Sequence, residues 1–180
     1  STPAGESVAI TGFSYDQQWI SEDRSEAYPN RDTLVDYHIG LLHGDNSSTD
    51  GQKRYAPFNP SQLASHGYDY WALGHIHKGQ VIYENPAMVY PGNIQGASFK
   101  EDGAKGALIV NLTKGVPAEL EFIETAEWQF QHSTRDLGPV NSLDTLRNNI
   151  ETALHEHIMF AKDEAVNVIS RMTFLTDGNE

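Results

Sequence analysis

Two short, largely apolar runs, each leading into histidine, limit the fold of this 180-residue chain more than any other feature. The first covers residues 37–43 and ends in His43. The second covers residues 69–74 and leads directly into His75 and His77. Short runs of this kind, largely apolar along their length, are typical of strands buried in layered α/β folds. They therefore predict an α/β fold in which both strands lie near the centre of the sheet.

The rest of the chain predicts short strands, one early helix and one late helix. A short helix is expected over residues 60–67, with proline near its start and glycine at its end. Apolar residues spaced by three and four then predict a helix from the N-cap Ser142 to about residue 160. Further strands, bounded in part by turn-forming residues, are expected at residues 7–13, 80–84, 87–90, 106–112, 118–123, 127–132 and 166–175.

The composition fits a packed chain and excludes several classes of site. Hydrophobic residues make up 38% and charged residues 21%, which is enough apolar material for a core. The chain has no cysteine, so disulfides, thiolate zinc sites and cysteine nucleophiles are excluded. No apolar run approaches the ~20 residues of a membrane span, and no segment is typical of a signal peptide. We therefore expect no membrane association and a cytoplasmic location.

The charge balance is strongly acidic, with 12 basic residues against 25 acidic ones and a net charge of −13. This balance excludes a wide basic face for nonspecific nucleic-acid binding on this chain alone. A phosphate-containing ligand would therefore be bound locally, through cations, or by surfaces outside this chain.

Three of the eight histidines are positioned for metal binding. His75 and His77 are two residues apart, and such residues of a strand point to the same face, so both imidazoles can approach one site. His43 ends the other buried strand, and sites in open α/β sheets gather outside the C-terminal ends of strands. Imidazole suits Zn, Cu, Fe and Ni, so the ligands alone do not choose the metal. The alternative is that all three are ordinary polar residues at strand ends.

The remaining histidines have no partner at a ligating spacing. His155 and His157 lie about 200° apart on a helix of 3.6 residues per turn, so they cannot bind one ion together. Both are expected on a solvated face of the helix. His38, His66 and His132 are expected to be structural or exposed.

Other residues beside the histidine motifs have a structural and a functional interpretation. Tyr68, Tyr70 and Trp71 could stack on nucleic-acid bases, but their place in or beside a buried strand favours core packing. Residues 90–93 form either a plain turn or a wall of the site. Lys78 could meet a phosphate, although a single lysine at a strand end is usually solvated.

Three motifs occur in an order that resembles the calcineurin-like metallophosphoesterase family. They are LLHG at residues 41–44, GYDYWALGHIH at residues 67–77 and YPGNIQG at residues 90–96. Within that family, residues 7–135 are similar to the bacterial DNA repair exonucleases of the SbcD and YhaO type. The family's early motifs, an Asp-x-His, a Gly-Asp and a Gly-Asn-His-Asp, have no usable counterpart. Residues 36–38 match the Asp-x-His pattern. They lie so close to the later histidine motif that we interpret the match as a coincidence.

The resemblance implies a fold and a division into domains. The fold is the C-terminal half of a metallophosphoesterase β-sandwich flanked by helices, followed by the start of an α/β capping domain. Residues 1–137 are expected to form the C-terminal portion of the phosphoesterase domain, and residues 138–180 the truncated start of the capping domain.

The resemblance also implies a chemistry. It implies two divalent metal ions, expected to be Mn, with the residue matching His77 on one ion and those matching His43 and His75 on the other. It further implies hydrolysis of DNA phosphodiesters in DNA repair and an SMC-like ATPase subunit as partner. The chain alone is expected to be inactive and to self-associate through an uncovered sheet edge or face. The alternatives are hydrolysis of a small phosphate ester or cyclic nucleotide, and a non-catalytic interaction module.

Overall fold

In a computed structural model, which describes residues 2–3, 5–46, 55–163 and 167–177, the chain divides into two compact units. The first unit comprises Ser1–Asn93 and Ala107–Ile123, and the second comprises Ile94–Gly106 and Glu124–Glu180. The chain therefore enters the second unit, returns to the first and enters the second again, so each unit is described separately below.

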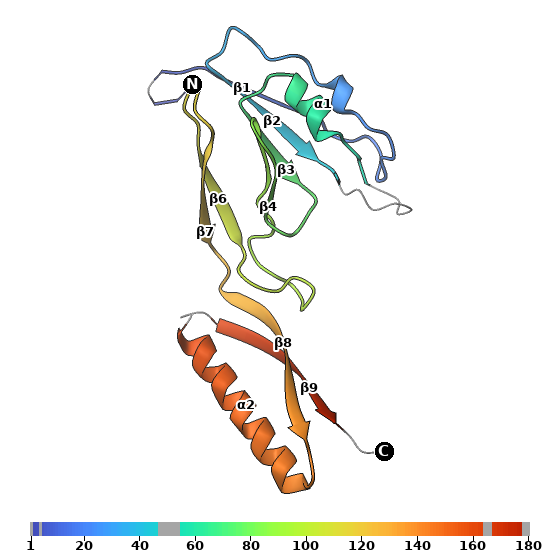
Figure 1. Cartoon of the computed structure of the whole chain (residues 1–180). Helices are drawn as coiled ribbons and strands as arrows, with labels where there is room; N and C mark the ends of the chain where they lie inside the picture. Colours follow the sequence, from blue (N-terminus) through green and yellow to red (C-terminus); the bar gives the residue numbers. More distant parts are fainter. Residues whose placement is uncertain (1, 4, 47–54, 164–166, 178–180) are drawn as a thin grey trace. The chain divides into compact units, whose positions relative to one another are not determined.

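A five-stranded sheet with the order β1-β2-β3-β5-β4 forms the centre of the first unit (Figure 1). The neighbouring pairs among β1, β2, β3 and β5 are parallel, and β4 runs antiparallel to β5 at one edge. The predicted strands at residues 37–43 and 69–74 are confirmed and have neighbours on both sides. The five strands are β1 (Val8–Gly12), β2 (Tyr37–His43), β3 (Tyr70–Gly74), β4 (Gln80–Glu84) and β5 (Ala87–Tyr90).

Different layers cover the two faces of this sheet, because successive strand residues point to opposite faces. On one face, β3 and β5 pack with the short helix α1 (Pro60–Ser65) and with Tyr28, which follows the 3-10 helix η1 (Ser25–Ala27). On the other face, β3 and β5 pack against β6 (Gly106–Asn111) and β7 (Glu119–Glu124), which form a two-stranded sheet. This layering confirms the expected α/β sandwich fragment.

Trp71 is the centre of the helix-covered face, where its side chain is completely buried. Its ring stacks on Tyr68 with centroids 4.6 Å apart and meets the edge of Tyr28 at 4.8 Å. The neighbouring position on β2 is Gly40, where an added Cβ would lie 2.2 Å from the Trp71 ring. Tyr68, Tyr70 and Trp71 are all buried, so the prediction that they pack in the core is confirmed.

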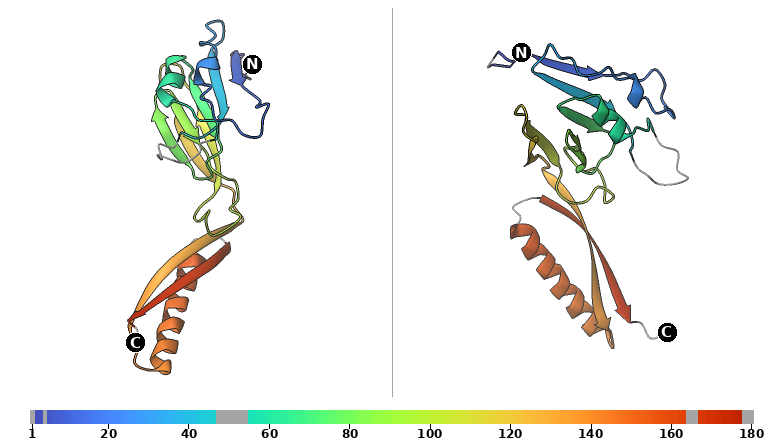
Figure 2. Two further views of the ribbon diagram at one scale, coloured as in Figure 1. Left: turned by 90° about the vertical axis from the view of Figure 1, so that its right-hand side faces the viewer. Right: turned by 45° about the horizontal axis from the view of Figure 1, so that its top comes forward.

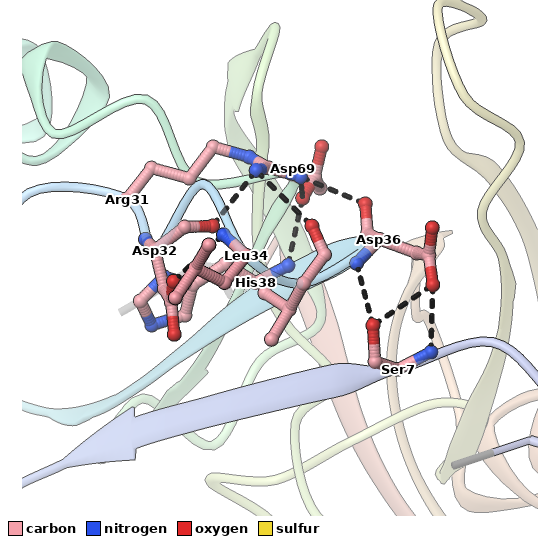
Figure 3. Close-up of polar contacts among 8 residues, drawn as sticks. Ser7, Arg31, Asp32, Leu34, Asp36, His38 and Asp69 are labelled. Carbon is pink, nitrogen blue, oxygen red and sulfur yellow. Dashed lines mark hydrogen bonds and ion pairs between the residues drawn. The ribbon is translucent and has the colours of Figure 1, made fainter.

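A polar network joins the starts of β1, β2 and β3 (Figure 3). The Arg31 guanidinium donates to the main-chain oxygen of Asp36 at 2.7 Å and to Asp69 Oδ2 at 3.1 Å. Asp69 Oδ2 also accepts the main-chain N–H of His38 at 2.7 Å. The main-chain N–H and the hydroxyl of Ser7 donate to Asp36 Oδ2, and these bonds hold the pKa of Asp36 below its usual range.

His38 belongs to this structural end of the sheet rather than to a metal site. Its side chain is buried, and its Nδ1 accepts the main-chain N–H of Asp32 at 2.9 Å. Its Nε2 lies 2.7 Å from Thr11 Oγ1, and its ring stacks on Tyr68. His66 is also buried, with Nε2 2.9 Å from the main-chain oxygen of Ser25. Both histidines are structural, as predicted.

The second unit pairs β8 (Trp128–Pro139) in parallel with β9 (Asn167–Asp177), with α2 (Leu143–Asp163) between them in sequence. Figure 2 shows α2 running along one face of this strand pair. Ser142 Oγ accepts the N–H of Thr145 at 3.1 Å, which confirms the predicted N-cap. The strand predicted to end at residue 132 continues to Pro139. The expected boundary between residues 137 and 138 therefore falls inside β8, and the assignment of domains stays a prediction.

One prediction for α2 is wrong. His155 is exposed as expected, but His157 is buried and its Nε2 lies 2.5 Å from Ser170 Oγ of β9. His157 continues the helical spacing of Ile150 and Ala153, and this face of the helix packs on the strands. The spacing of two residues correctly predicts that the two side chains lie on different sides of the helix. It does not show which of them packs on the strands.

Several large apolar side chains of the second unit remain exposed. Leu143 of α2 is 83% exposed, and Ile158 of α2 and Leu175 of β9 are about half exposed, at 51% and 52%. A single helix and two strands thus leave apolar surface uncovered, as the sequence predicted. Self-association of the chain stays a prediction. Within the described residues, every helix is too short or too polar to cross a membrane.

We expect Gly40→Ala to lower the free energy of unfolding by about 1–3 kcal/mol, the usual cost of overpacking a filled core. The added methyl group would overlap the Trp71 ring. Urea unfolding followed by circular dichroism measures the change. Trp71→Phe is the control background, because a smaller ring should reduce the cost of Gly40→Ala. An equal cost in both backgrounds would show that the Trp71 ring is not the cause.

We expect stability to fall as the pH is lowered from 7 to 5. Burial lowers the pKa of His38, so below the usual histidine value of about 6.5 the unfolded chain binds more protons than the folded chain. His38→Gln should reduce the slope of unfolding free energy against pH, by at most about 1.4 kcal/mol per pH unit. The measurement is urea unfolding at several pH values. The exposed His155→Gln should keep the wild-type slope, and the same slope in His38→Gln would contradict the prediction.

Candidate metal centre

The register of the central strands brings two imidazoles together. His43 is the last residue of β2 and pairs with Gly74, the last residue of β3. Because the strands are parallel, both end at the same edge of the sheet, and His75 follows β3 directly. The ring centroids of His43 and His75 lie 5.3 Å apart, with the planes at 73°. The expected convergence of the three imidazoles is confirmed for His43 and His75, and for His77 it stays a prediction.

Gly74 makes room for this pair. A Cβ at position 74 would lie 2.8 Å from His43 Nδ1, so any other residue would push the His43 imidazole away. The glycine of this motif is therefore explained by the close approach of a neighbouring ring, as well as by the end of the strand.

The expectation that His75 and His77 lie on one strand and point to the same face is wrong. β3 ends at Gly74, and His75 has φ = 103°, which takes the chain out of the strand. The alternation of a strand therefore does not apply to these residues. A non-glycine residue at this φ is uncommon and costs free energy, and such conformations cluster at functional sites.

His77 lies in the loop after His75, and its side chain is exposed. The loop packs against residues 91–93, which follow β5, and the main-chain N–H of Asn93 donates to the His77 oxygen at 3.3 Å. Gly92 has φ = 80°, and a Cβ there would lie 3.0 Å from the same oxygen. This segment therefore supports the histidine loop, and Pro91 also lines a pocket together with His43 and Gly74.

The pKa of His43 is lowered, first by desolvation and then by the positive charges that His75 and His77 would carry. A lowered pKa keeps the imidazole of His43 neutral at neutral pH, and the neutral ring is the form that binds a metal ion.

Tyrosine side chains support the strand ends. Tyr90, fully buried, donates its hydroxyl to the main-chain oxygen of Gly44 at 2.6 Å, and burial raises its pKa. The Tyr15 hydroxyl donates to the main-chain oxygen of His43 at 2.8 Å. Tyr55 stacks on the His75 ring with centroids 5.1 Å apart. Tyr15 and Tyr55 lie outside the histidine motifs, so spacing gives no signal for them.

The imidazole nitrogens of His43 and His75 fit part of a metal site. Among the described residues, no group of three or more His, Cys, Asp or Glu side chains is arranged to hold one ion. His43 and His75 offer two nitrogen donors at one sheet edge, and imidazole is a ligand for many divalent metals. They can therefore supply two ligands to one ion, with further ligands coming from elsewhere. The assignment of His43, His75 and His77 as metal ligands stays a prediction.

A curated bacterial protein is similar to most of this chain. No family model matches the chain. A stretch of 145 residues is 38% identical to the uncharacterized metallophosphoesterase YhaO of Bacillus subtilis (strain 168). This similarity supports the metallophosphoesterase family. The match covers 80% of this chain but only 35% of that relative.

Two glycines at this edge provide a test of the geometry. We expect Gly74→Ala to leave the free energy of unfolding within about 0.5 kcal/mol of wild type, because the exposed His43 ring can swing away. The nuclear Overhauser contact between the His43 and His75 rings should then disappear.

Gly44→Ala is the matched variant, because its Cβ would lie 2.2 Å from the main-chain oxygen of Ala56. A main-chain atom cannot swing aside, so we expect a loss of about 1–3 kcal/mol in urea unfolding. If Gly74→Ala keeps the ring contact, or if the two variants are equally stable, the described packing of this edge is incorrect.

Proposed function

We propose that this chain supplies imidazole ligands to the two-metal centre of a longer DNA exonuclease that acts in DNA repair. The observation that carries the proposal is the pair of imidazoles, His43 and His75, side by side at the ends of two parallel strands. In this proposal His43 and His75 bind one ion and His77 the other. The remaining ligands would come from elsewhere in the protein.

The chain's own residues would bind and orient in this reaction. When bound, divalent ions, proposed to be Mn, would stabilise charge on the phosphate and lower the pKa of a water molecule. His43 and His75 would hold their ion as neutral rings, and Tyr15 would fix the main chain of His43 through its hydroxyl. With a net charge of −13, the chain depends on cations to approach a phosphodiester.

DNA as the substrate is supported by the three motifs that resemble the DNA repair exonucleases of the SbcD and YhaO type. The same resemblance supports an SMC-like ATPase subunit as the partner that controls access to DNA. One observation favours a second candidate, a phosphoesterase acting on a small phosphate ester or a cyclic nucleotide. The acidic chain has no wide basic face for a DNA backbone, and a small ester needs none.

The proposal is tested on the full-length protein with Mn²⁺, using end-labelled linear DNA and bis(p-nitrophenyl) phosphate in parallel. We expect hydrolysis of DNA from its ends. His75→Ala should lower the rate by more than about 100-fold, the upper end of the effect of groups that merely orient metal ligands. His155→Ala, an exposed histidine on α2, is the control and should keep the wild-type rate.

Three results would contradict the proposal. Hydrolysis of the small ester without hydrolysis of DNA would favour the second candidate. The absence of metal-dependent hydrolysis of either substrate would favour a non-catalytic interaction module. Wild-type activity in His75→Ala would show that the imidazole pair does not form the centre.

A further inference from the structure

An aromatic cluster lies against the histidine pair of the first unit. The ring of Tyr55 lies over the imidazole of His75, with centroids 5.1 Å apart and planes at 23°. Tyr55 also makes three edge contacts, with centroid distances of 5.9 Å to His43, 5.9 Å to Tyr15 and 5.8 Å to Trp19. The cluster therefore joins the loop after β1, the loop after β2 and the residue that follows β3.

The main chain around Tyr55 is held independently of these rings. The N–H of Asp45 donates to the oxygen of Tyr55 at 3.0 Å, and the N–H of Ala56 donates to the oxygen of Ile20 at 2.7 Å. Ala56 is buried, and its oxygen fills the space that a side chain at Gly44 would need. The main chain of Tyr55 is therefore held in place, and its ring can pack against another side chain.

His75 is less constrained by its own main chain. It follows the end of β3 at a φ of 103°, and its side chain is half-buried. A half-buried side chain outside regular structure retains rotamer freedom, and metal binding must remove that freedom. Within the described part of the chain, its ring contacts are those with Tyr55 and His43.

We propose that Tyr55 is a positioning residue that holds the His75 imidazole in the orientation needed for metal binding, and that Tyr15 and Trp19 hold Tyr55. This inference rests on the proposed function, because it takes His75 to be a metal ligand. A ring already held in the metal-free protein loses less freedom when the ion binds, so the ion binds more tightly. The contact uses the face of the Tyr55 ring, so phenylalanine should serve in its place.

The test uses the full-length protein and two readouts. The first is the affinity for Mn²⁺, measured by isothermal titration calorimetry. The second is the set of three-bond couplings that report the His75 χ1 angle in the metal-free protein. We expect Tyr55→Leu to weaken Mn²⁺ binding about tenfold, or about 1.4 kcal/mol, and to average the couplings over several rotamers. A tenfold loss lies at the lower end of the effects of groups that orient metal ligands.

Two variants separate positioning from a general structural effect. Tyr55→Phe should restore both the affinity and the single rotamer of His75. Tyr37→Leu, a half-buried tyrosine at the opposite end of β2, should leave both readouts unchanged. If Tyr55→Leu unfolds the protein, Trp19→Leu takes its place, since Trp19 is 48% exposed and its ring meets the Tyr55 ring edge-on. It should weaken Mn²⁺ binding in the same direction, and unchanged binding would overturn the inference.

The results distinguish this inference from the proposed function. If His75→Ala abolishes Mn²⁺ binding while Tyr55→Leu keeps wild-type affinity and rotamer, the positioning role of Tyr55 is overturned and the proposed function stands. If His75→Ala binds Mn²⁺ as wild type does, His75 is not a ligand, and both the ligand assignment and the inference fail.

Discussion

The parallel register between β2 and β3 is the constraint on which the rest of the first unit depends. It sets Gly40 beside Trp71 and His43 beside Gly74. A slip by one residue would turn every side chain of β2 to the opposite face. The Trp71 ring would then meet a side chain in the space that Gly40 leaves open. The packing of the core therefore holds the register, and the register holds the imidazoles of His43 and His75 side by side.

The two ends of this sheet serve different purposes. At the start of β2 and β3, Arg31 and Asp69 satisfy main-chain groups and join the strands in one network. At the other end, the chain leaves the sheet at once, and His75 takes a conformation that regular structure does not allow. The paired polar groups therefore lie at one end of the sheet, and the uncommon conformation lies at the other, where metal binding is proposed. A neutral, partly desolvated His43 fits that role, because a charged ring would repel a cation.

The strands and the late helix could be predicted because burial leaves a local pattern. The apolar runs at residues 37–43 and 69–74 and the three-four spacing after Ser142 each describe one face or one layer. The pairing of His43 with His75 also followed, since parallel strands end at one edge. The departure of the chain from the strand at His75 could not be predicted, because the φ of this residue depends on the loop that follows. The burial of His157 does not follow from its distance to His155, because that spacing shows only that the two rings cannot bind one ion; it follows from the helical spacing with Ile150 and Ala153.

The sequence by itself determined the class of the fold, the order of its strands along the chain and the motifs that support the metallophosphoesterase family. Each of these depends on residues that lie close together in the chain. Only the tertiary structure decided that Gly74 accommodates the His43 ring, that Tyr90 supports Gly44 and that Tyr55 stacks on His75. These contacts join strand ends and loops that lie far apart in the sequence, so they depend on strand pairing and packing that no local pattern of residues encodes.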